Sequence, residues 1–148
     1  MADKKIRLRV ITPTEIKFDE KVNMAIMRCT TGDLGVLPGH EARTAVLDFG
    51  ALRVFSDVSD VRMIAIYGGL AEIKGDVVTI LANDAEWPQD IDFEHARAEQ
   101  EELERKLHNK DEDYLDIQRD QIKLRRALVQ IELSSYPHLA KTDEYNYD

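Results

Sequence analysis

Hydrophobic residues alternate with polar ones along the first half of the chain, at the period of two that marks half-buried β-strands. Ile6, Leu8 and Val10 are separated by arginines, and Val22, Met24 and Ile26 repeat the spacing. Further strands are predicted over residues 43–47, 51–55, 62–67, 70–73 and 77–81, with turn signals at residues 48–50, 56–57, 68–69 and 74–76. Short strands spaced in this way predict an antiparallel β-sandwich or barrel.

The hydrophobic period lengthens to three and four after Pro88, which is the spacing of an amphipathic helix. Asp90 and Asp92 stand where a helix N-cap is expected. The contact face predicted for a first helix carries Phe93, Ala96, Gln100, Leu103 and Leu107, and that of a second carries Tyr114, Ile117, Gln121, Leu124, Leu128 and Ile131. Only the polar run 108–113 separates the two helices, so an antiparallel hairpin is predicted.

These patterns place the chain in the α+β class, with three parts. An N-terminal antiparallel β-sandwich is predicted over residues 1–87, and a C-terminal antiparallel two-helix hairpin over residues 88–134. Residues 135–148 show no periodicity and are expected to form a flexible tail. Alanine and glutamine occupy several contact positions of the hairpin, so it is expected to need packing against another surface.

The second helix carries two further faces besides the one that contacts the first helix. A basic stripe consists of Arg119, Lys123 and Arg126, and an adjacent apolar strip consists of Ile122, Val129 and Leu133. A basic stripe alone is commonly a solvated helix face with local ion pairs. A helix that is apolar on two sides usually has two partners, or one partner in each of two conformations. We therefore interpret the second helix as an interaction element.

Composition and charge argue against several classes of function. The formal net charge of −9 argues against nucleic-acid binding, which needs a basic surface. Cys29 is the only cysteine, so no intrachain disulfide forms, and no metal-ligand spacing is present. No run reaches the ~18 apolar residues of a membrane span, and no phosphate-binding loop or nucleophile motif occurs. His40 beside Glu41, near Asp33, invites a catalytic interpretation but lacks a nucleophile. We expect a soluble, non-catalytic protein without a metal or cofactor, in which Cys29 is a small core residue.

Residues 31–40 combine three glycines and a proline with apolar side chains. Glycine supplies positive φ or room for close backbone approach, and Pro38 fixes φ and removes a donor. We expect a rigid, tightly turned loop between strands that presents Leu34, Val36 and Leu37 outward. A structural corner of the sheet and a docking surface are both compatible with this composition.

The sequence Gly32-Asp-Leu-Gly-Val-Leu-Pro-Gly-His40 closely resembles the segment G-E/D-x-G-x-L-P-G-H of the epsilon subunits of bacterial and organellar F-type ATP synthases. Tyr67-Gly-Gly69-Leu-Ala-Glu72, Val78-Thr-Ile-Leu-Ala82 and Ala85-Glu86 extend the resemblance, which covers the chain to about Leu133. The resemblance implies a β-sandwich of ten short strands followed by two helices, without a catalytic site. It also implies a rotor subunit that joins the gamma subunit of the central stalk to the ring of c subunits.

The same resemblance implies roles for particular residues. The family's docking loop, which contacts the c-ring and gamma, corresponds here to Thr31, Asp33, Leu34, Val36, Leu37 and His40. In family members that inhibit ATP hydrolysis, the second helix rises along gamma to the alpha/beta catalytic head. The implied contacts with an acidic segment of beta are Arg119, Lys123, Arg125 and Arg126, and the implied contacts with gamma are Ile122, Val129 and Leu133.

Some family members bind ATP through a segment I/L-D-x-x-R-A at the start of the first helix. This chain has Ile91, Asp92, His95 and Ala96 at the corresponding positions, with histidine in place of arginine. A neutral histidine gives phosphate no permanent forked cation, so ATP binding is expected to be weak or absent.

Two alternatives remain open. One is the same rotor subunit without inhibitory activity, and the other is a free-standing β-sandwich binding module whose helices dimerise it. For the rotor subunit, the resemblance implies a peripheral position on the cytoplasmic face of the bacterial plasma membrane, or on the stromal side of the plastid thylakoid. Membrane association would then occur only through the complex.

Overall fold

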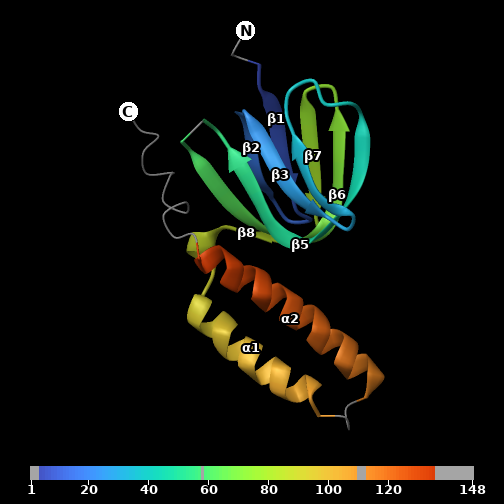
Figure 1. Cartoon of the computed structure of the whole chain (residues 1–148), viewed down its shortest axis with the longest axis vertical. Coiled ribbons are helices and arrows are strands. Elements are labelled where there is room, and N and C mark those ends of the chain that lie inside the picture. The colour runs from blue at the N-terminus through green and yellow to red at the C-terminus, as the bar shows by residue number, and fades with distance from the viewer. Residues whose placement is uncertain (1–3, 58, 110–112, 136–148) are drawn as a thin grey trace.

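The computed structural model describes residues 4–57, 59–109 and 113–135. It contains a β-sandwich with two helices packed against one end, as Figure 1 shows. The strands are β1 (Ile6–Ile11), β2 (Ile16–Val22), β3 (Met24–Cys29), β4 (Gly32–Val36), β5 (Arg43–Phe55), β6 (Val61–Lys74), β7 (Val77–Ala82) and β8 (Ala85–Glu86). The short helix η1 (Pro88–Asp90) leads to α1 (Phe93–Leu107) and α2 (Tyr114–Ser134). The predicted α+β class, a sandwich followed by two helices, is confirmed.

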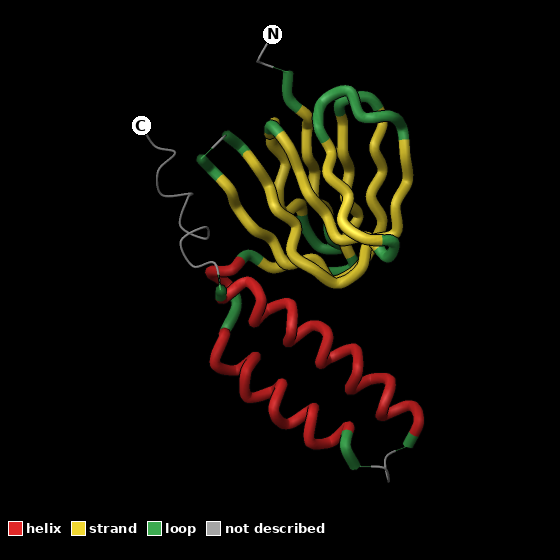
Figure 2. The backbone as a smooth tube through the Cα atoms, viewed as in Figure 1, coloured by secondary structure: helices red, strands yellow, loops and turns green. Residues whose placement is uncertain are grey.

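The strands form one hydrogen-bonded sheet in the order β2-β1-β7-β6-β5-β3-β4, with β8 paired to β6. The sheet folds over so that its two halves face each other (Figure 2). Within the described ranges every pair is antiparallel except β1 with β7, which is parallel. The prediction of a wholly antiparallel sandwich is therefore wrong at this pair. Turn signals specify only the pairing of strands that are neighbours in sequence, and β1 and β7 are far apart.

The two longest strands, β5 and β6, have 13 and 14 residues and bend from one layer of the sandwich into the other. The core-facing side of β6 changes from even to odd positions, from Ile66 before the bend to Ala71 after it. This change falls at Gly68 and Gly69, whose φ values are +79° and +142°. The turns predicted at residues 48–50 and 68–69 are therefore bends within continuous strands. Each bent strand serves both layers, so the eight strands correspond to ten shorter segments.

β2 was not expected from the hydrophobic pattern, because it is an edge strand in which only Phe18 and Val22 are buried. A bend at Asn23 adds one residue between β2 and β3 and thereby reverses the alternation. The core side chains of β3 are consequently at odd positions, and Met24 and Ile26 are only half-buried. The prediction that Met24 and Ile26 share the face of Val22 is wrong for this reason.

Two clusters of buried apolar residues stabilise the fold. The larger cluster lies inside the sandwich and includes Cys29, whose thiol pKa is raised by burial, as fits a core residue rather than a reactive thiol. The smaller cluster lies between the outer face of the sheet and the helices, and consists of Ala51, Met63, Ala65, Tyr67, Ile91, Val129 and Leu133. Full burial of one aliphatic side chain stabilises by about 1.5–3 kcal/mol, so Val129 and Leu133 together hold α2 with about 3–6 kcal/mol.

α1 and α2 form the predicted antiparallel hairpin, and α2 lies between α1 and the sandwich (Figure 1). α1 begins after Asp92, as predicted, because the Asp92 carboxylate accepts a hydrogen bond from the backbone N–H of His95 (3.0 Å). Asp90, the other predicted cap, lies in η1. Ala96 and Leu103 are the buried residues of α1, in agreement with its predicted contact face.

The contact face predicted for α2 is only partly correct. Ile117, Leu124 and Ile131 are half-buried, but Tyr114, Gln121 and Leu128 are exposed. The helix is rotated toward the sandwich, which offers a larger apolar surface than α1 does, and its buried residues are Asp120, Ala127, Val129 and Leu133. The hairpin thus packs on another surface, as its thin contact face predicts. The predicted tail lies, from residue 136 onward, outside the described residues.

Candidate functional site

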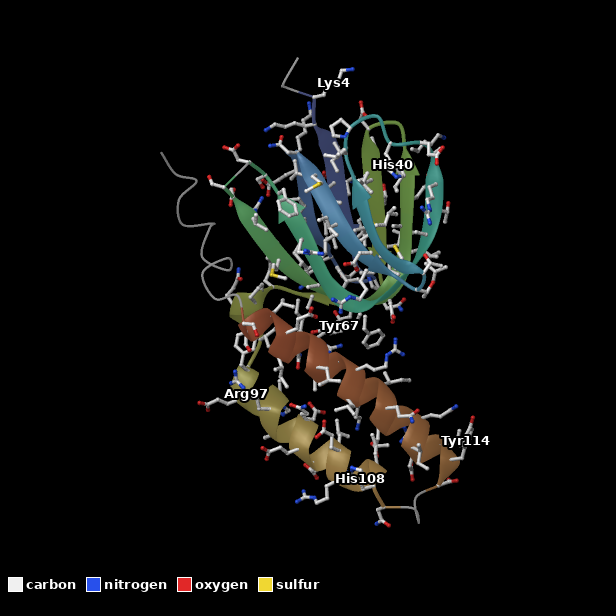
Figure 3. All side chains as sticks on the ribbon, viewed as in Figure 1. Lys4, His40, Tyr67, Arg97, His108 and Tyr114 are labelled. Atoms are coloured by element: carbon white, nitrogen blue, oxygen red, sulfur yellow. The ribbon has the colours of Figure 1, made fainter. Side chains whose placement is uncertain are left out.

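The 31–40 segment is a strand followed by a turn rather than the single loop predicted. β4 occupies residues 32–36 and pairs with β3 along its whole length. A hydrogen bond from His40 N–H to the Leu37 carbonyl (3.2 Å) closes the turn, and Gly39 N–H donates to the Asp76 carboxylate (3.1 Å). Figure 3 places His40 on the sandwich well away from the helices. Because a strand advances about 3.4 Å per residue, Thr31 and His40 lie at opposite ends of β4.

The side chains predicted to dock from this segment differ in exposure. Leu37 is 56% exposed, whereas Val36 is fully buried and Leu34 packs against the core of the sandwich. The outward orientation predicted for Val36 and Leu34 is therefore wrong, because alternate side chains of a paired strand point inward. Thr31 and Asp33 are exposed and His40 is half-buried, so these residues and Leu37 remain accessible.

Asp33 belongs to an ion-pair network on the outer face of the sheet. Its carboxylate lies 3.3 Å from Arg53 Nη2 and 4.0 Å from Arg28 Nε. Arg28 Nη2 also lies 2.9 Å from Glu132 Oε1 of α2, and this hydrogen bond raises the pKa of Arg28. The network therefore connects β4 to the C-terminal part of α2. Asp33 takes part in contacts near the helices, whereas Leu37 and His40 lie at the other end of β4.

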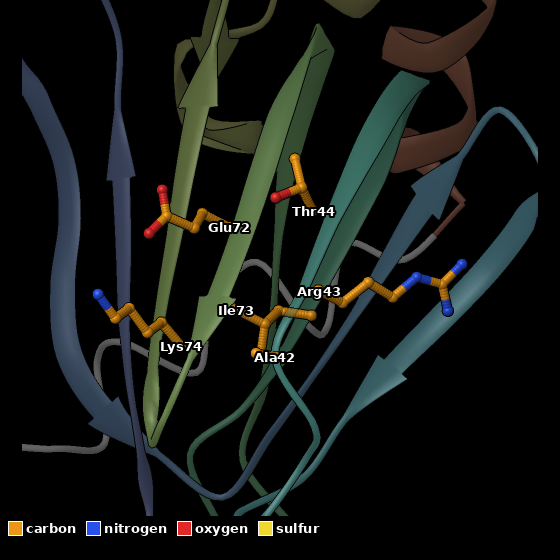
Figure 4. Close-up of a pocket in the computed structure, with 6 residues that line it drawn as sticks. All are labelled: Ala42, Arg43, Thr44, Glu72, Ile73 and Lys74. Atoms are coloured by element: carbon orange, nitrogen blue, oxygen red, sulfur yellow. The ribbon is translucent and has the colours of Figure 1, made fainter.

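A surface hollow of about 420 Å³ lies at the outer ends of β5 and β6. Its lining residues are Ala42, Arg43, Thr44, Glu72, Ile73 and Lys74. In Figure 4 the side chains of Glu72 and Lys74 point to one side and that of Arg43 to the other. A small-molecule site needs polar groups that converge, so this hollow supports neither catalysis nor ligand binding.

Polar contacts concentrate where α2 meets the sandwich, near Tyr67 (Figure 3). Arg126 Nη2 lies 2.9 Å from Asp84 Oδ2 and 3.0 Å from Glu86 Oε1, and the guanidinium lies 4.0 Å from the centroid of the Tyr67 ring. The same Glu86 oxygen accepts hydrogen bonds from the Tyr67 hydroxyl (2.6 Å) and the Gln130 amide (3.0 Å). We call Tyr67, Asp84, Glu86, Arg126 and Gln130 the Arg126 cluster.

Tyr67 takes part in this cluster as a hydrogen-bond donor, so its hydroxyl must be protonated. Its side chain is buried, and burial together with the hydrogen bond to Glu86 raises the pKa of Tyr67 far above its usual value. The proton therefore stays on Tyr67 throughout the physiological range, and the cluster keeps its full set of contacts there.

Arg125 makes a second connection between α2 and the sandwich. Its guanidinium contacts the Asp48 carboxylate and lies 4.5 Å from the centroid of the Phe49 ring. Arg125 and Arg126, both predicted to contact the catalytic head, are thus engaged by carboxylates of the sandwich in this structure. They hold the middle of α2, and Glu132 holds its C-terminal part.

The other predicted inhibitory residues fall into two groups. Val129 and Leu133 are buried against the sheet, so in this structure the sandwich is the second partner of a helix that is apolar on two sides. Arg119, Ile122 and Lys123 are exposed, and neither Arg119 nor Lys123 forms an ion pair with any residue that the structure describes. The docked helix therefore keeps one apolar and two basic side chains available to solvent.

The predicted nucleotide segment borders a hollow of about 380 Å³ between the helices and the sandwich. The residues that line the hollow are Glu86, Asp90, Asp92, His95, Glu99, Lys123, Arg126 and Gln130. His95 Nδ1 lies 3.8 Å from the Glu99 carboxylate, and Ile91 and Ala96 are buried. Carboxylates outnumber permanent cations here, and Arg126 is already paired, so the site offers little to a phosphate.

Sequence reasoning missed the sandwich residues that bind α2. Asp48 lies 77 positions from Arg125 and Glu86 lies 40 positions from Arg126, so no local pattern joins them. Their one common feature in the sequence is a carboxylate close to the bend or end of a strand. That feature is too frequent to identify a partner.

The part of the chain that the structure describes contains no group of three His, Cys, Asp or Glu side chains that could hold a metal ion. None of the helices in these described residues has the length and apolar character needed to cross a membrane.

Comparison with known proteins identifies a family. Residues 5–88 match the family described as ATP synthase, Delta/Epsilon chain, beta-sandwich domain. The chain is 36% identical over 129 residues to the ATP synthase epsilon chain of Halalkalibacterium halodurans. The aligned region covers 87% of this chain and 96% of that relative. It is 42% identical over 108 residues to the ATP synthase epsilon chain of Prochlorococcus marinus, and the aligned region covers 72% of this chain and 79% of that relative.

Solved structures agree with these relatives. A chain in the cryo-EM structure of the Euglena gracilis mitochondrial ATP synthase, described as OSCP/F1/c-ring, matches with a TM-score of 0.77 and 26% identity, covering 88% of this chain and 81% of that one. A chain from the central stalk and c-ring of the Tetrahymena thermophila mitochondrial ATP synthase matches with a TM-score of 0.56 and 14% identity, covering 90% and 98%. The second similarity concerns the fold alone.

Proposed function

The chain belongs to the epsilon subunits of F-type ATP synthases, and we propose that it is a non-catalytic rotor subunit joining the gamma subunit to the c-ring. The similar Euglena chain belongs to an assembly that contains F1 and the c-ring, which supports this position. Docking on the c-ring falls to Leu37 and His40, which are accessible at the turn after β4, whereas Thr31 and Asp33 lie at the other end of that strand. The segment and the hollow beside it lack a nucleophile with a base, so the proposed role is structural.

We further propose that α2 inhibits ATP hydrolysis when it leaves the sandwich and reaches the catalytic head. The observation that carries this proposal is the binding of Arg125 and Arg126 to Asp48, Asp84 and Glu86. A helix that binds carboxylates of its own sandwich is suited to bind an acidic segment of another subunit in their place. The sandwich and the catalytic head then compete for the same two arginines.

Truncation of the hairpin tests this function. A variant that ends at Asn109 lacks α2, and the soluble catalytic complex that carries it should hydrolyse ATP faster than the complex with the full chain. Binding of both forms to the complex is measured in parallel. Equal hydrolysis across ATP concentrations, with both forms bound, favours the rotor subunit without inhibitory activity. Failure of the full chain to bind the complex contradicts the rotor assignment and favours a free-standing module.

ATP is not an expected ligand of the folded hairpin. His95 occupies the position of the motif arginine, and Asp90, Asp92, Glu86 and Glu99 surround the place where phosphates would lie. Like charges at close range oppose phosphate binding. Regulation of this chain by ATP binding to the hairpin is therefore not part of the proposed function.

The proposed location is peripheral, on the cytoplasmic face of the plasma membrane, with attachment to the membrane only through the complex. The bacterial and cyanobacterial relatives support this location. The stromal side of a plastid thylakoid is the alternative. Release of the chain from washed membranes together with the other soluble subunits would agree with the proposal.

A further inference from the structure

A further hollow lies on the outer face of the sheet, beside the end of α2. Its volume is about 400 Å³, and its lining includes Arg28, Arg53, Phe55, Val61, Met63 and Glu132. Cross-strand pairing places Arg53 opposite Met63 and Phe55 opposite Val61, so charged and apolar side chains share this part of the sheet. We call this the Arg53 hollow.

The Arg53 hollow continues the surface on which α2 docks. Met63 and Ala51 line the hollow and also belong to the smaller apolar cluster, in which Leu133 of α2 is buried. Glu132 of α2 lines the hollow as well, and its carboxylate lies 2.9 Å from Arg28. Figure 1 shows the end of α2 close to the sandwich. A segment that fills the hollow would therefore extend the contact between the helix and the sheet without interruption.

The chemistry of the hollow favours an acidic and aromatic occupant. The Arg53 side chain is 41% exposed and lies 3.3 Å from the carboxylate of Asp33. A guanidinium has five N–H donors, so Arg53 can bind a second carboxylate. Phe55 and Val61 are half-buried and offer apolar surface beside it. An occupant with a carboxylate next to aromatic rings matches both parts of the lining.

Residues 136–148, which lie outside the described residues, have this composition. They contain three acidic residues and a single lysine, and Tyr145 and Tyr147 lie among the acidic residues. Alternate side chains of an extended segment fall on the same side, so Asp143, Tyr145 and Tyr147 can meet the hollow together. Docking in this form needs no helical or strand periodicity, which the segment lacks.

The segment is long enough to reach the hollow. α2 ends at its C-cap Ser135, about 5 Å along the helix axis from Glu132. An extended chain spans up to about 3.6 Å per residue, so Tyr145 can lie as far as about 35 Å from Ser135. Pro137 stands two residues after the C-cap, where proline is common because it does not continue a helix. The tether keeps the segment near the hollow at a local concentration on the order of millimolar, so weak contacts are sufficient.

We propose that residues 139–148 dock in the Arg53 hollow and extend the contact of α2 with the sandwich. The rings of Tyr145 and Tyr147 pack on the apolar lining, and Asp143 binds Arg53. Because the segment continues from α2, a helix that moves away from the sandwich must pull it out of the hollow. Docking of the segment therefore adds to the contacts that hold α2. A second copy of the chain has the same chemistry but lacks the tether.

A spin label in the full chain tests the inference. The label is attached to Asn146→Cys; the native Cys29 is buried, and the parent chain treated with the same reagent shows that Cys29 stays unlabelled. Amide signals of Arg53 and Phe55 should be lost in nuclear magnetic resonance spectra. Signals of Arg9 and Thr79, which pair with each other on β1 and β7, should persist.

Charge reversal supplies a matched pair of variants. Arg53→Glu in the labelled chain should restore the lost signals, because it replaces the guanidinium by a carboxylate that repels the segment. Arg7→Glu removes another exposed arginine that is paired with an aspartate, Asp19 at 2.9 Å, and should leave the loss unchanged. The spectra themselves show whether each variant is folded.

Removal of the segment gives a second measurement. In a chain that ends at Ser135, the α2 amides should exchange about 5- to 10-fold faster than in the full chain, where tenfold corresponds to about 1.4 kcal/mol. Four results would overturn the inference. They are full signals in the labelled chain, equal restoration by Arg7→Glu, unchanged exchange after truncation, and a loss that requires mixing of labelled and unlabelled chains, which would make a second copy the occupant.

Discussion

Replacement of Glu86 by glutamine should loosen α2 while leaving the sandwich folded. Glu86 Oε1 accepts hydrogen bonds from the Tyr67 hydroxyl at 2.6 Å, from Arg126 at 3.0 Å and from Gln130 at 3.0 Å. Glutamine keeps the size of the side chain and one acceptor oxygen but removes the negative charge. The change therefore acts on the strength of these contacts rather than on packing.

The expected magnitude follows from what the substitution removes. A hydrogen bond to a charged group contributes about 1.5–3 kcal/mol. Arg126 keeps its contact with Asp84 at 2.9 Å, and the glutamine oxygen still accepts from Tyr67, so the loss should equal about one such bond. The equilibrium between docked and released α2 then shifts by about 10- to 150-fold. Val129 and Leu133 remain buried, so the docked state should still predominate.

Hydrogen exchange of the α2 amides in the isolated chain measures this shift. Amides around residues 126–133 should exchange faster by the same factor in Glu86→Gln, because they exchange through release of the helix. Asp19→Asn is a matched control, since it removes the charge from an exposed ion pair with Arg7 on β1. If Glu86→Gln leaves the exchange of α2 unchanged, the Arg126 cluster does not hold the helix and the reasoning is refuted.

Three further expectations follow from the structure. Gly69→Ala should lower the free energy of unfolding by about 2–4 kcal/mol, because the added Cβ would lie 2.1 Å from the Leu81 carbonyl oxygen. Gly75→Ala places its Cβ where no atom lies within 4 Å and should cost only about 1 kcal/mol. Urea unfolding measures both changes. The raised pKa of Tyr67 means that its contribution to α2 docking is complete below pH ~10 and declines above it, so ultraviolet titration should show one tyrosine that resists ionisation. His95→Arg should strengthen ATP binding, and calorimetry that finds micromolar affinity in the parent chain would contradict the assigned role of His95.

Strands and helices with a sustained hydrophobic period could be predicted from the sequence. Places where that period shifts from one face of an element to the other could not. The strand at Ile6 and the helix capped by Asp92 have clear local patterns, and both form as predicted. Gly68 and Gly69 interrupt the alternation in the same way whether the chain reverses or bends, and only the pairing of β6 with β5 and β7 distinguishes the two. β2 escaped prediction because an edge strand does not require alternation.

The same limit applies to the candidate site. The basic stripe of α2 could be recognised because its members lie on one helix, at a spacing visible in the sequence. The carboxylates that bind Arg125 and Arg126 come from β5 and from the segment around β8, so they become neighbours only through tertiary packing.

The dual use of Arg125 and Arg126 determines how inhibition must be tested. Charge reversal of both residues would weaken the docked state and the proposed inhibitory state together, so the two effects on hydrolysis would oppose each other. Arg119 is exposed and forms no ion pair within the described part of the chain, so Arg119→Glu acts on the inhibitory state alone. This variant should raise ATP hydrolysis by the catalytic complex with unchanged exchange of α2. Glu86→Gln should lower hydrolysis, because it releases α2 from the sandwich without removing a basic residue. If both variants change hydrolysis in the same direction, the sandwich and the catalytic head do not compete for α2.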